Sequence, residues 1–329
     1  KTIKDLMQRL ILILFIACEL CFYLLIAQTG IVEYFSSNIF LIAPLPIGGI
    51  IGTLLVSYIK IENTNKISIF LTLQLLMSFI YPNYNFLTLF ILGIAVGSLA
   101  PLIINEIKRT SLVELGFALC ISYVTGTFLF NYDVSQRGFI AITLTLIVLI
   151  ASRFLPQNPE NNTSIDSKHS LFLMVLWVFL DSALFESLSR DVSISIWRDG
   201  FTLEIALFHI IGVVCALYFK IERNQKELFI ITLFALSYLF YFLREGFILS
   251  LIYPFVISYY NVVILQTISK KDFKTITFYM VFIGWIASGA GLFVALENLI
   301  LFVPIVLLIA LIKIMTREYL PKNKEITYV

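Results

Sequence analysis

Charged residues are scarce in this chain of 329 residues: they make up 13% of the sequence, whereas 60% of the residues are hydrophobic. Soluble globular domains have about 25% charged residues, and the mean hydropathy here is +0.95. So few charges cannot cover a soluble domain, and the net charge of +2 says little. We therefore expect an integral membrane protein that is surrounded by the lipid bilayer and has no nucleic-acid partner.

Residues and motifs that carry chemistry are also few. The chain has two histidines and four cysteines, and the cysteines all lie in apolar runs, where they behave as small hydrophobic side chains. No G-x-x-x-x-G-K-[ST], G-x-S-x-G or H-E-x-x-H pattern occurs. We expect no enzyme, no cofactor and no direct use of ATP.

Long apolar runs are abundant instead. A helix needs about 20 apolar residues to cross about 30 Å of hydrocarbon, and short polar segments separate twelve such runs. Some runs are short or nearly contiguous, which leaves ten or eleven spans as alternatives. The sequence predicts an all-α membrane protein of about twelve transmembrane helices. The predicted spans are 8–29, 37–59, 66–80, 84–105, 111–131, 137–153, 169–188, 200–219, 227–243, 246–268, 274–296 and 298–315.

The basic residues predict the orientation of these spans. If both termini are cytoplasmic, 19 of the 23 Lys and Arg residues fall on the cytoplasmic side. This bias follows the positive-inside rule, and an error in the number of spans would scramble it. We therefore expect a multi-pass protein with both termini in the cytoplasm, in a bacterial inner membrane. The four basic residues left on the outer side are Arg137, Arg190, Arg198 and Arg244.

An internal repeat divides the chain into two halves. The longest polar segment, 153–170, separates six spans from six, and IIGTLLVSYIKIENTNK (50–66) aligns with IIGVVCALYFKIERNQK (210–226). Eight positions are identical and three of these are charged, so shared hydrophobicity does not explain the match. The sequence predicts two pseudo-symmetric six-helix bundles in parallel orientation. The predicted domains are 1–155, a cytoplasmic linker at 156–168, and 169–329.

The stretch PIGGIIGTLLVSYIKIENTNK (46–66), in which a glycine-rich helix runs into a basic loop, resembles the signature loop of the major facilitator superfamily of transporters. Gly48, Gly49 and Gly52 match its glycines, whereas Ser57 stands near the usual acid and a later glycine is missing. The resemblance identifies no subfamily, substrate or direction. It implies that spans 1, 2, 4, 5, 7, 8, 10 and 11 surround a central cavity and that spans 3, 6, 9 and 12 face lipid. It also implies alternating access by a secondary transporter of a small molecule or an ion.

Two acids lie at the expected depth of such a cavity. Glu19 in FIACELCFY and Asp181 in WVFLDSALF occupy related positions in the two halves, near the midplane. On insertion scales, placing an acid at the centre of a membrane helix costs about 2.5–3.5 kcal/mol. We therefore expect each acid to have either a hydrogen-bonding partner or a function. We predict that they bind a cationic substrate or a coupling proton, with proton coupling as the first expectation. Neutral, hydrogen-bonded helix contacts are the alternative.

Other polar groups complete the candidate site. Glu186 precedes Arg190 by four residues, a spacing that predicts an ion pair on one helix face. The further substrate-binding or proton-binding candidates are His209, Tyr123, Asn261 and Trp285. The candidate gating residues are Glu186, Arg190, Arg198 and Arg244.

Two alternative functions remain at this point. Cys18 and Cys21 flank Glu19 and, with Asp181 and His209, would make a soft site for a transition metal. Transition-metal transport is therefore one alternative, although we expect no resident metal. The other is a non-transporting membrane subunit or assembly factor that is built on a transporter fold. The short loops leave little surface for a soluble partner, which argues against this second alternative. We expect a monomer.

Overall fold

The computed structural model of the chain describes residues 3–35, 39–155, 169–191, 193–219 and 221–319. These residues form helices and short connections without a strand, and each of the twelve predicted spans has a helical counterpart. Seven helical segments are long and apolar enough to cross a membrane, and four shorter apolar helices accompany them. The predicted linker 156–168 lies outside the described residues.

Some spans are single helices and others consist of two or three helical segments. The six spans of the first half, in chain order, are α1 (Ile3–Phe22) with the π-helical η1 (Tyr23–Gln28) and α2 (Gly30–Tyr34); α3 (Ile39–Ile42) with α4 (Pro44–Leu55); α5 (Asn63–Ser78); α6 (Phe86–Ile107); α7 (Leu112–Phe130); and η2 (Val134–Gln136) with α8 (Gly138–Ser152). In the second half they are α9 (Leu171–Arg190); α10 (Thr202–Tyr218); α11 (Arg223–Phe242); α12 (Gly246–Ile268); α13 (Phe273–Met280) with the π-helical η3 (Val281–Ala287) and α14 (Ser288–Leu296); and η4 (Ile300–Phe302) with α15 (Val303–Tyr319).

Polar side chains fix where several of these helices begin. Asn85, Ser111, Ser170 and Asp272 each accept a hydrogen bond from a backbone N–H in the first turn of α6, α7, α9 and α13. Such caps satisfy donors that a helix start leaves free. The polar segments between the apolar runs therefore set the helix boundaries.

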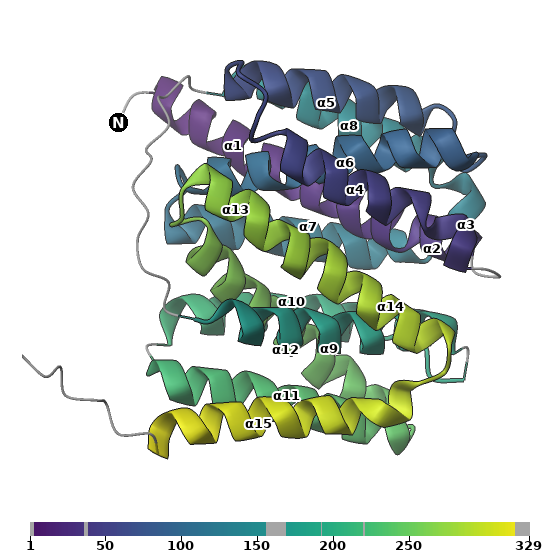
Figure 1. The fold of residues 1–329 in the computed structure, drawn as a ribbon, viewed down its shortest axis with the longest axis vertical. Helices are drawn as coiled ribbons and strands as arrows, with labels where there is room; N and C mark the ends of the chain where they lie inside the picture. Colours follow the sequence, from purple (N-terminus) through teal and green to yellow (C-terminus); the bar gives the residue numbers. More distant parts are fainter. Residues whose placement is uncertain (1–2, 36–38, 156–168, 192, 220, 320–329) are drawn as a thin grey trace, which may run out of the picture.

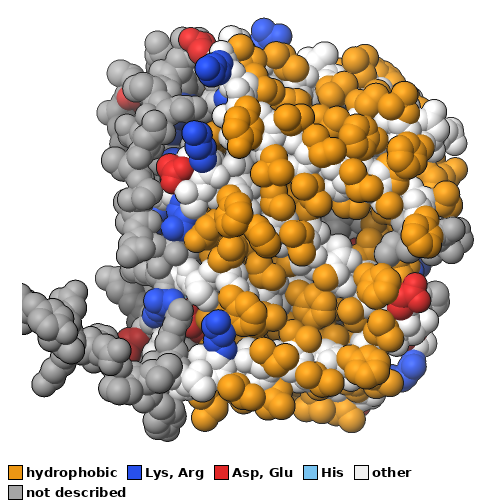
Figure 2. Space-filling view, viewed as in Figure 1, with side chains coloured by type: hydrophobic (Ala, Val, Ile, Leu, Met, Phe, Trp, Pro, Cys, Tyr) orange, Lys and Arg blue, Asp and Glu red, His pale blue; other side chains and the backbone are white. Residues whose placement is uncertain are grey.

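The two halves lie one above the other, with the helices of the first half in purple to blue and those of the second in teal to yellow (Figure 1). Because the helices alternate in direction, α1 and α9 begin at the same end of the bundle, where α8 and α15 end. We call this the terminal end and the opposite one the distal end. A broad hydrophobic surface covers the visible face between these two ends, and most Lys and Arg side chains in this view lie along the terminal end (Figure 2).

The repeat noted in the sequence corresponds to one helix contact in each half. A Cβ on Gly52 of α4 would lie 2.3 Å from the carbonyl oxygen of Ile94 in α6. A Cβ on Gly212 of α10 would lie 2.5 Å from the carbonyl oxygen of Phe255 in α12. The two glycines stand at the repeat offset, so each half uses a glycine to bring its second and fourth spans into backbone contact.

The π-helical segment η1 interrupts the first span just after Glu19, and a buried arginine supports it. Arg137 is 1% exposed, and its guanidinium donates to the Leu25 carbonyl (3.1 Å), the Thr29 hydroxyl (3.0 Å) and the Phe130 carbonyl (2.6 Å). These contacts supply donors where the wider helix changes the regular hydrogen bonding. Arg137 thus fixes the end of the first span against the start of the sixth.

Candidate functional site

A cavity lies between the two halves and contains about 1320 Å³ of empty space, including the part that is open to the surroundings. Its described walls come from α1, η1, α6, α7, α9, α12, α13, η3 and α14, and the spans that were expected to face lipid contribute none of its lining. Most of the lining is apolar. The residues with polar side chains are Glu19, Tyr23, Gln28, Ser122, Tyr123, Asp181, Ser182, Tyr260, Asn261 and Ser288.

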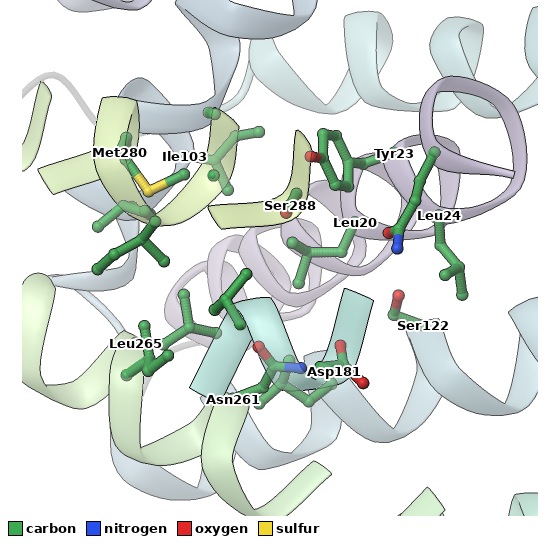
Figure 3. A pocket seen from close by; sticks show the side chains of 18 of the residues that line it. Leu20, Tyr23, Leu24, Ile103, Ser122, Asp181, Asn261, Leu265, Met280 and Ser288 are labelled. Atoms are coloured by element: carbon green, nitrogen blue, oxygen red, sulfur yellow. The ribbon is translucent and has the colours of Figure 1, made fainter. Parts of the chain in front are cut away.

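Asp181 lies on the α9 wall of this cavity and is held by two tyrosines of α12. One carboxylate oxygen accepts from the Tyr253 hydroxyl at 2.7 Å, and the other accepts from the Tyr260 hydroxyl at 2.6 Å. Asp181 lies beside Asn261, and both lie across the cavity from Tyr23 and the neighbouring residues of the first span (Figure 3). Among the described residues no Lys, Arg or His forms an ion pair with Asp181.

Glu19 lines the opposite half of the same cavity. Its side chain is 3% exposed, and one carboxylate oxygen accepts from the Gln74 amide at 3.1 Å. Gln74 is fully buried, and its amide nitrogen also lies 3.3 Å from the Thr145 hydroxyl. Gln74 and Thr145 come from α5 and α8, the third and sixth spans. These peripheral helices therefore position an acid of the cavity although they do not line it.

Sequence reasoning missed Gln74 because the third span was expected to face lipid, so its polar side chains were not considered for the site. The signal was present, since Gln74 is an amide in the middle of an apolar run. A buried amide needs hydrogen-bond partners just as a buried acid does. Pairing the two polar side chains would have been a reasonable expectation from the sequence.

The other predicted binding residues divide into two groups. Tyr123 and Asn261 line the cavity, and His209 and Trp285 do not. The imidazole of His209 stacks on Tyr123 with ring centroids 4.5 Å apart, and its Nδ1 lies 2.6 Å from the Ser258 hydroxyl. His209 therefore lies behind the cavity wall, in the contact of α10 with α7 and α12.

Trp285 joins the two halves instead of facing the cavity. Its Nε1 donates to the Thr53 hydroxyl at 2.9 Å, and its ring covers Gly49, where a Cβ would come within 2.2 Å of the indole. Because α4 and η3 belong to different halves, this contact and the Tyr123–His209 stack are both parts of the interface between the halves.

The predicted gating residues lie at the distal end with partners that the sequence spacing does not give. Arg198 forms an ion pair with Glu33, which joins the second half to the first. Arg244 donates to the Ser193 hydroxyl and lies 3.8 Å from Asp191. The prediction of a Glu186–Arg190 ion pair is wrong: within the described part of the chain, the two groups do not come within ion-pairing distance.

Glu186 and Arg190 instead line a second cavity together with Arg198 and Glu33. It contains about 700 Å³ of empty space, including its open part. We call it the distal pocket. It adjoins the central cavity, because Phe185 and Gln28 line the central cavity while the next residues along the chain, Glu186 and Thr29, line the distal pocket. Its lining residues are Thr29, Val32, Glu33, Glu186, Ser189, Arg190 and Arg198.

The cysteines next to Glu19 do not form a metal site in the structure. Cys18 and Cys21 are buried, and neither lines the central cavity. Within the described ranges, no three His, Cys, Asp or Glu side chains come together as metal ligands.

Comparison with solved structures identifies the fold. An outward-facing major facilitator superfamily transporter, FucP, matches with a TM-score of 0.61 and 12% identity over 94% of this chain and 98% of that chain. A variant of the fucose:proton symporter FucP from E. coli gives a TM-score of 0.57 at 12% identity over 94% and 98%. An outward-facing bacterial homologue of the iron transporter ferroportin gives 0.57 at 12% over 95% and 98%. No protein-family model and no curated sequence matches the chain. The chain therefore has the fold of the major facilitator superfamily transporters, as the sequence predicts.

Proposed function

We propose that the protein is a secondary transporter that moves a small organic solute across a membrane by alternating access, with proton coupling. The observation that carries the proposal is the central cavity. Its lining holds two acids, Glu19 and Asp181, and no Lys, Arg or His among the described residues. The fold, which it shares with a fucose:proton symporter, supports the same class of function.

The cavity chemistry favours an amphipathic solute that is neutral or positively charged. Leu, Ile, Val and Phe side chains make up most of the wall, and these bury an apolar portion of a ligand. Tyr123, Tyr260 and Asn261 offer hydroxyl and amide groups on the side that holds Asp181. An anionic solute would have to approach two carboxylates without a compensating cation.

Glu19 and Asp181 are suited to exchange a proton for a solute because their present partners are neutral. Gln74 donates to Glu19, and Tyr253 and Tyr260 donate to Asp181. A neutral donor holds a carboxylate in place but does not neutralise its charge, so a proton or a cationic group must do so inside the membrane. We assign Asp181 to solute binding, since it lies beside Asn261, and Glu19 to the coupling proton.

Opening and closing would occur where the two halves touch. At the distal end, Arg198 pairs with Glu33, and Phe130 of the first half packs against Phe185 and Trp197 of the second. We assign these contacts to the distal gate. The terminal end, where most basic residues lie, is the cytoplasmic side in this proposal, and the carrier acts as a monomer in a bacterial inner membrane.

A proton-flux screen tests the proposal. Purified protein is reconstituted into liposomes that contain a pH-sensitive dye, and organic cations, sugars, amino acids and metal ions are added one at a time. We expect at least one organic solute to move protons, and Glu19→Gln to abolish that flux while still binding the solute. Arg153→Gln, which alters an exposed arginine at the terminal end that lines neither described cavity, is the control. Undiminished proton flux in Glu19→Gln would refute its coupling role.

Two other functions are outcomes of the same screen. Proton or metal flux with Fe²⁺, Zn²⁺, Cu²⁺ or Ni²⁺ alone, lost in Cys18→Ser, would favour the metal transporter, a function that the ferroportin homologue makes worth testing. No flux with any solute, together with stoichiometric copurification of another membrane complex, would favour a non-transporting subunit.

A further inference from the structure

The distal pocket contains charged groups whose hydrogen-bonding capacity is not used. The Nε and Nη2 atoms of Arg190 are buried and have no hydrogen-bond partner among the described residues, and the same holds for one carboxylate oxygen of Glu33. The Glu186 side chain is 3% exposed, and its carboxylate forms no ion pair within the described ranges. Buried polar groups in native proteins are almost always partnered, so these atoms need an occupant.

The free atoms of Arg190 have a specific geometry. Nε and Nη2 lie on the same edge of the planar guanidinium, and two parallel N–H groups on one edge match the two oxygens of a carboxylate. Neither Glu186 nor Glu33 takes up that edge, although both are close enough to interact with Arg190 electrostatically. The edge is therefore available to an oxyanion that comes from outside the chain.

Glu33 and Glu186 require hydrogen-bond donors, whereas Arg190 requires an acceptor. Ionised carboxylates are acceptors only, so the free oxygen of Glu33 and the Glu186 carboxylate require donors. The hydroxyls of Thr29 and Ser189 do not supply them, because they donate to backbone carbonyls of Leu24 and Glu186. An ammonium group would provide three donors and a positive charge.

The total charge of the pocket restricts the ligand further. With both acids ionised, Glu33 and Glu186 balance Arg190 and Arg198, and a ligand without a net charge preserves this balance. A small zwitterion meets both demands without changing the balance. The part of the pocket that water-sized groups can occupy measures about 310 Å³, at the lower end of the range of about 300–1,000 Å³ that is usual for small-molecule sites.

We propose that the distal pocket is a binding site for a small amino-acid-like zwitterion. Its carboxylate binds the free edge of Arg190, and its ammonium group lies between Glu33 and Glu186. The site is separate from the central cavity and does not depend on the proposed transport function. Because Glu33 and Arg198 also join the two halves, an occupant of this pocket would bind across the distal interface.

Calorimetric titration of the full-length protein in lipid nanodiscs tests this site. The probes are glycine, L-alanine, L-leucine and γ-aminobutyrate, together with N-acetyl-L-alanine and L-alaninamide, which each lack one of the two charges. We expect saturable binding of at least one of the four zwitterions. Both single-charge analogues should bind at least about 30-fold more weakly, as expected when one partner of a buried ionic contact is removed.

Variants then locate the binding. Arg190→Gln should weaken binding of the zwitterion by about 30-fold or more, and Glu186→Gln should weaken it in the same direction. Arg153→Gln, which alters an exposed arginine at the terminal end, should bind as the unmodified protein does. If Arg190→Gln does not fold, the analogue series on the unmodified protein still decides the matter. The proposal is overturned if none of the four zwitterions binds, if the analogues bind equally well, or if Asp181→Asn abolishes binding that Arg190→Gln leaves intact.

Discussion

Adding one methyl group at Gly52 should destabilise the first half of the protein. The new Cβ would lie 2.3 Å from the Ile94 carbonyl oxygen and 2.9 Å from the Ile94 Cα, whereas ordinary contacts begin at 3.4 Å. Because the obstacle is backbone, α4 and α6 would have to separate by about 1 Å. The shift would also stretch the hydrogen bond that the Ser98 hydroxyl donates to the Gly52 carbonyl at 3.0 Å.

The magnitude follows from three contributions at Gly52. Overpacking costs about 1–3 kcal/mol, and loss of the Ser98 hydrogen bond costs about 1 kcal/mol. Alanine in place of glycine favours the helix by about 1 kcal/mol. The net loss is therefore about 1–3 kcal/mol, and we expect an apparent melting temperature lower by an amount on the order of 5 °C.

Heating in detergent, followed by size-exclusion chromatography of the protein that remains folded, measures this change. Gly212→Ala should behave as Gly52→Ala does, because its Cβ would lie 2.5 Å from the Phe255 carbonyl oxygen. Gly289→Ala is the matched control, since nothing lies within 4 Å of its Cβ position. Equal melting temperatures for Gly52→Ala and Gly289→Ala would refute the reasoning.

Two further predictions concern local hydrogen bonds. Trp285→Phe should lower the free energy of unfolding by about 1 kcal/mol, because it removes the 2.9 Å hydrogen bond to Thr53. If the destabilisation by Trp285→Phe and that by Thr53→Val simply add in the double mutant, in the same heating assay, the hydrogen bond does not contribute and the prediction is contradicted. Hydrogen bonds from the Thr275 hydroxyl and N–H hold the pKa of Asp272 in the folded protein below its usual value near 3.8. The cap therefore stabilises the fold fully above pH 3.8. This stabilisation is lost as the pH falls through the lower pKa that Asp272 has in the folded protein. Asp272→Ala should cost about 0.5–2 kcal/mol at pH 7, and the difference from the unmodified protein should vanish at strongly acidic pH; a pH-independent difference would contradict the cap.

The sequence was sufficient for the fold because membrane spans leave a strong local signal. A run of apolar residues bounded by polar caps defines each helix, and the basic residues order the loops. The repeat around Gly52 and Gly212 corresponds to one close helix contact in each half. Glu19 and Asp181 could be placed in one cavity because depth and repeat position depend only on residue spacing.

Contacts between residues far apart in the chain could not be read in this way. Arg198 lies nearest in sequence to Asp199 but pairs with Glu33, 165 residues away. Glu186 and Arg190 have the spacing of a helical ion pair, yet both turn toward the distal pocket. Trp285 stands at cavity depth, but which face of the helix it occupies depends on the π-helical turn of η3. Such details are set by how the two halves dock, which no local pattern encodes.

Proton-dependent movement of the two halves is the most direct test of the account. In a background with serine at the four native cysteine positions, spin labels are placed at Tyr132 and Phe247 for the distal end, or at Phe154 and Phe219 for the terminal end. Pulsed electron spin resonance then gives the label separations at pH 8 and pH 5 in nanodiscs. We predict that one separation lengthens while the other shortens, and that Glu19→Gln removes this response. Separations that do not change with pH, or that change equally in Glu19→Gln, would contradict proton-coupled alternating access.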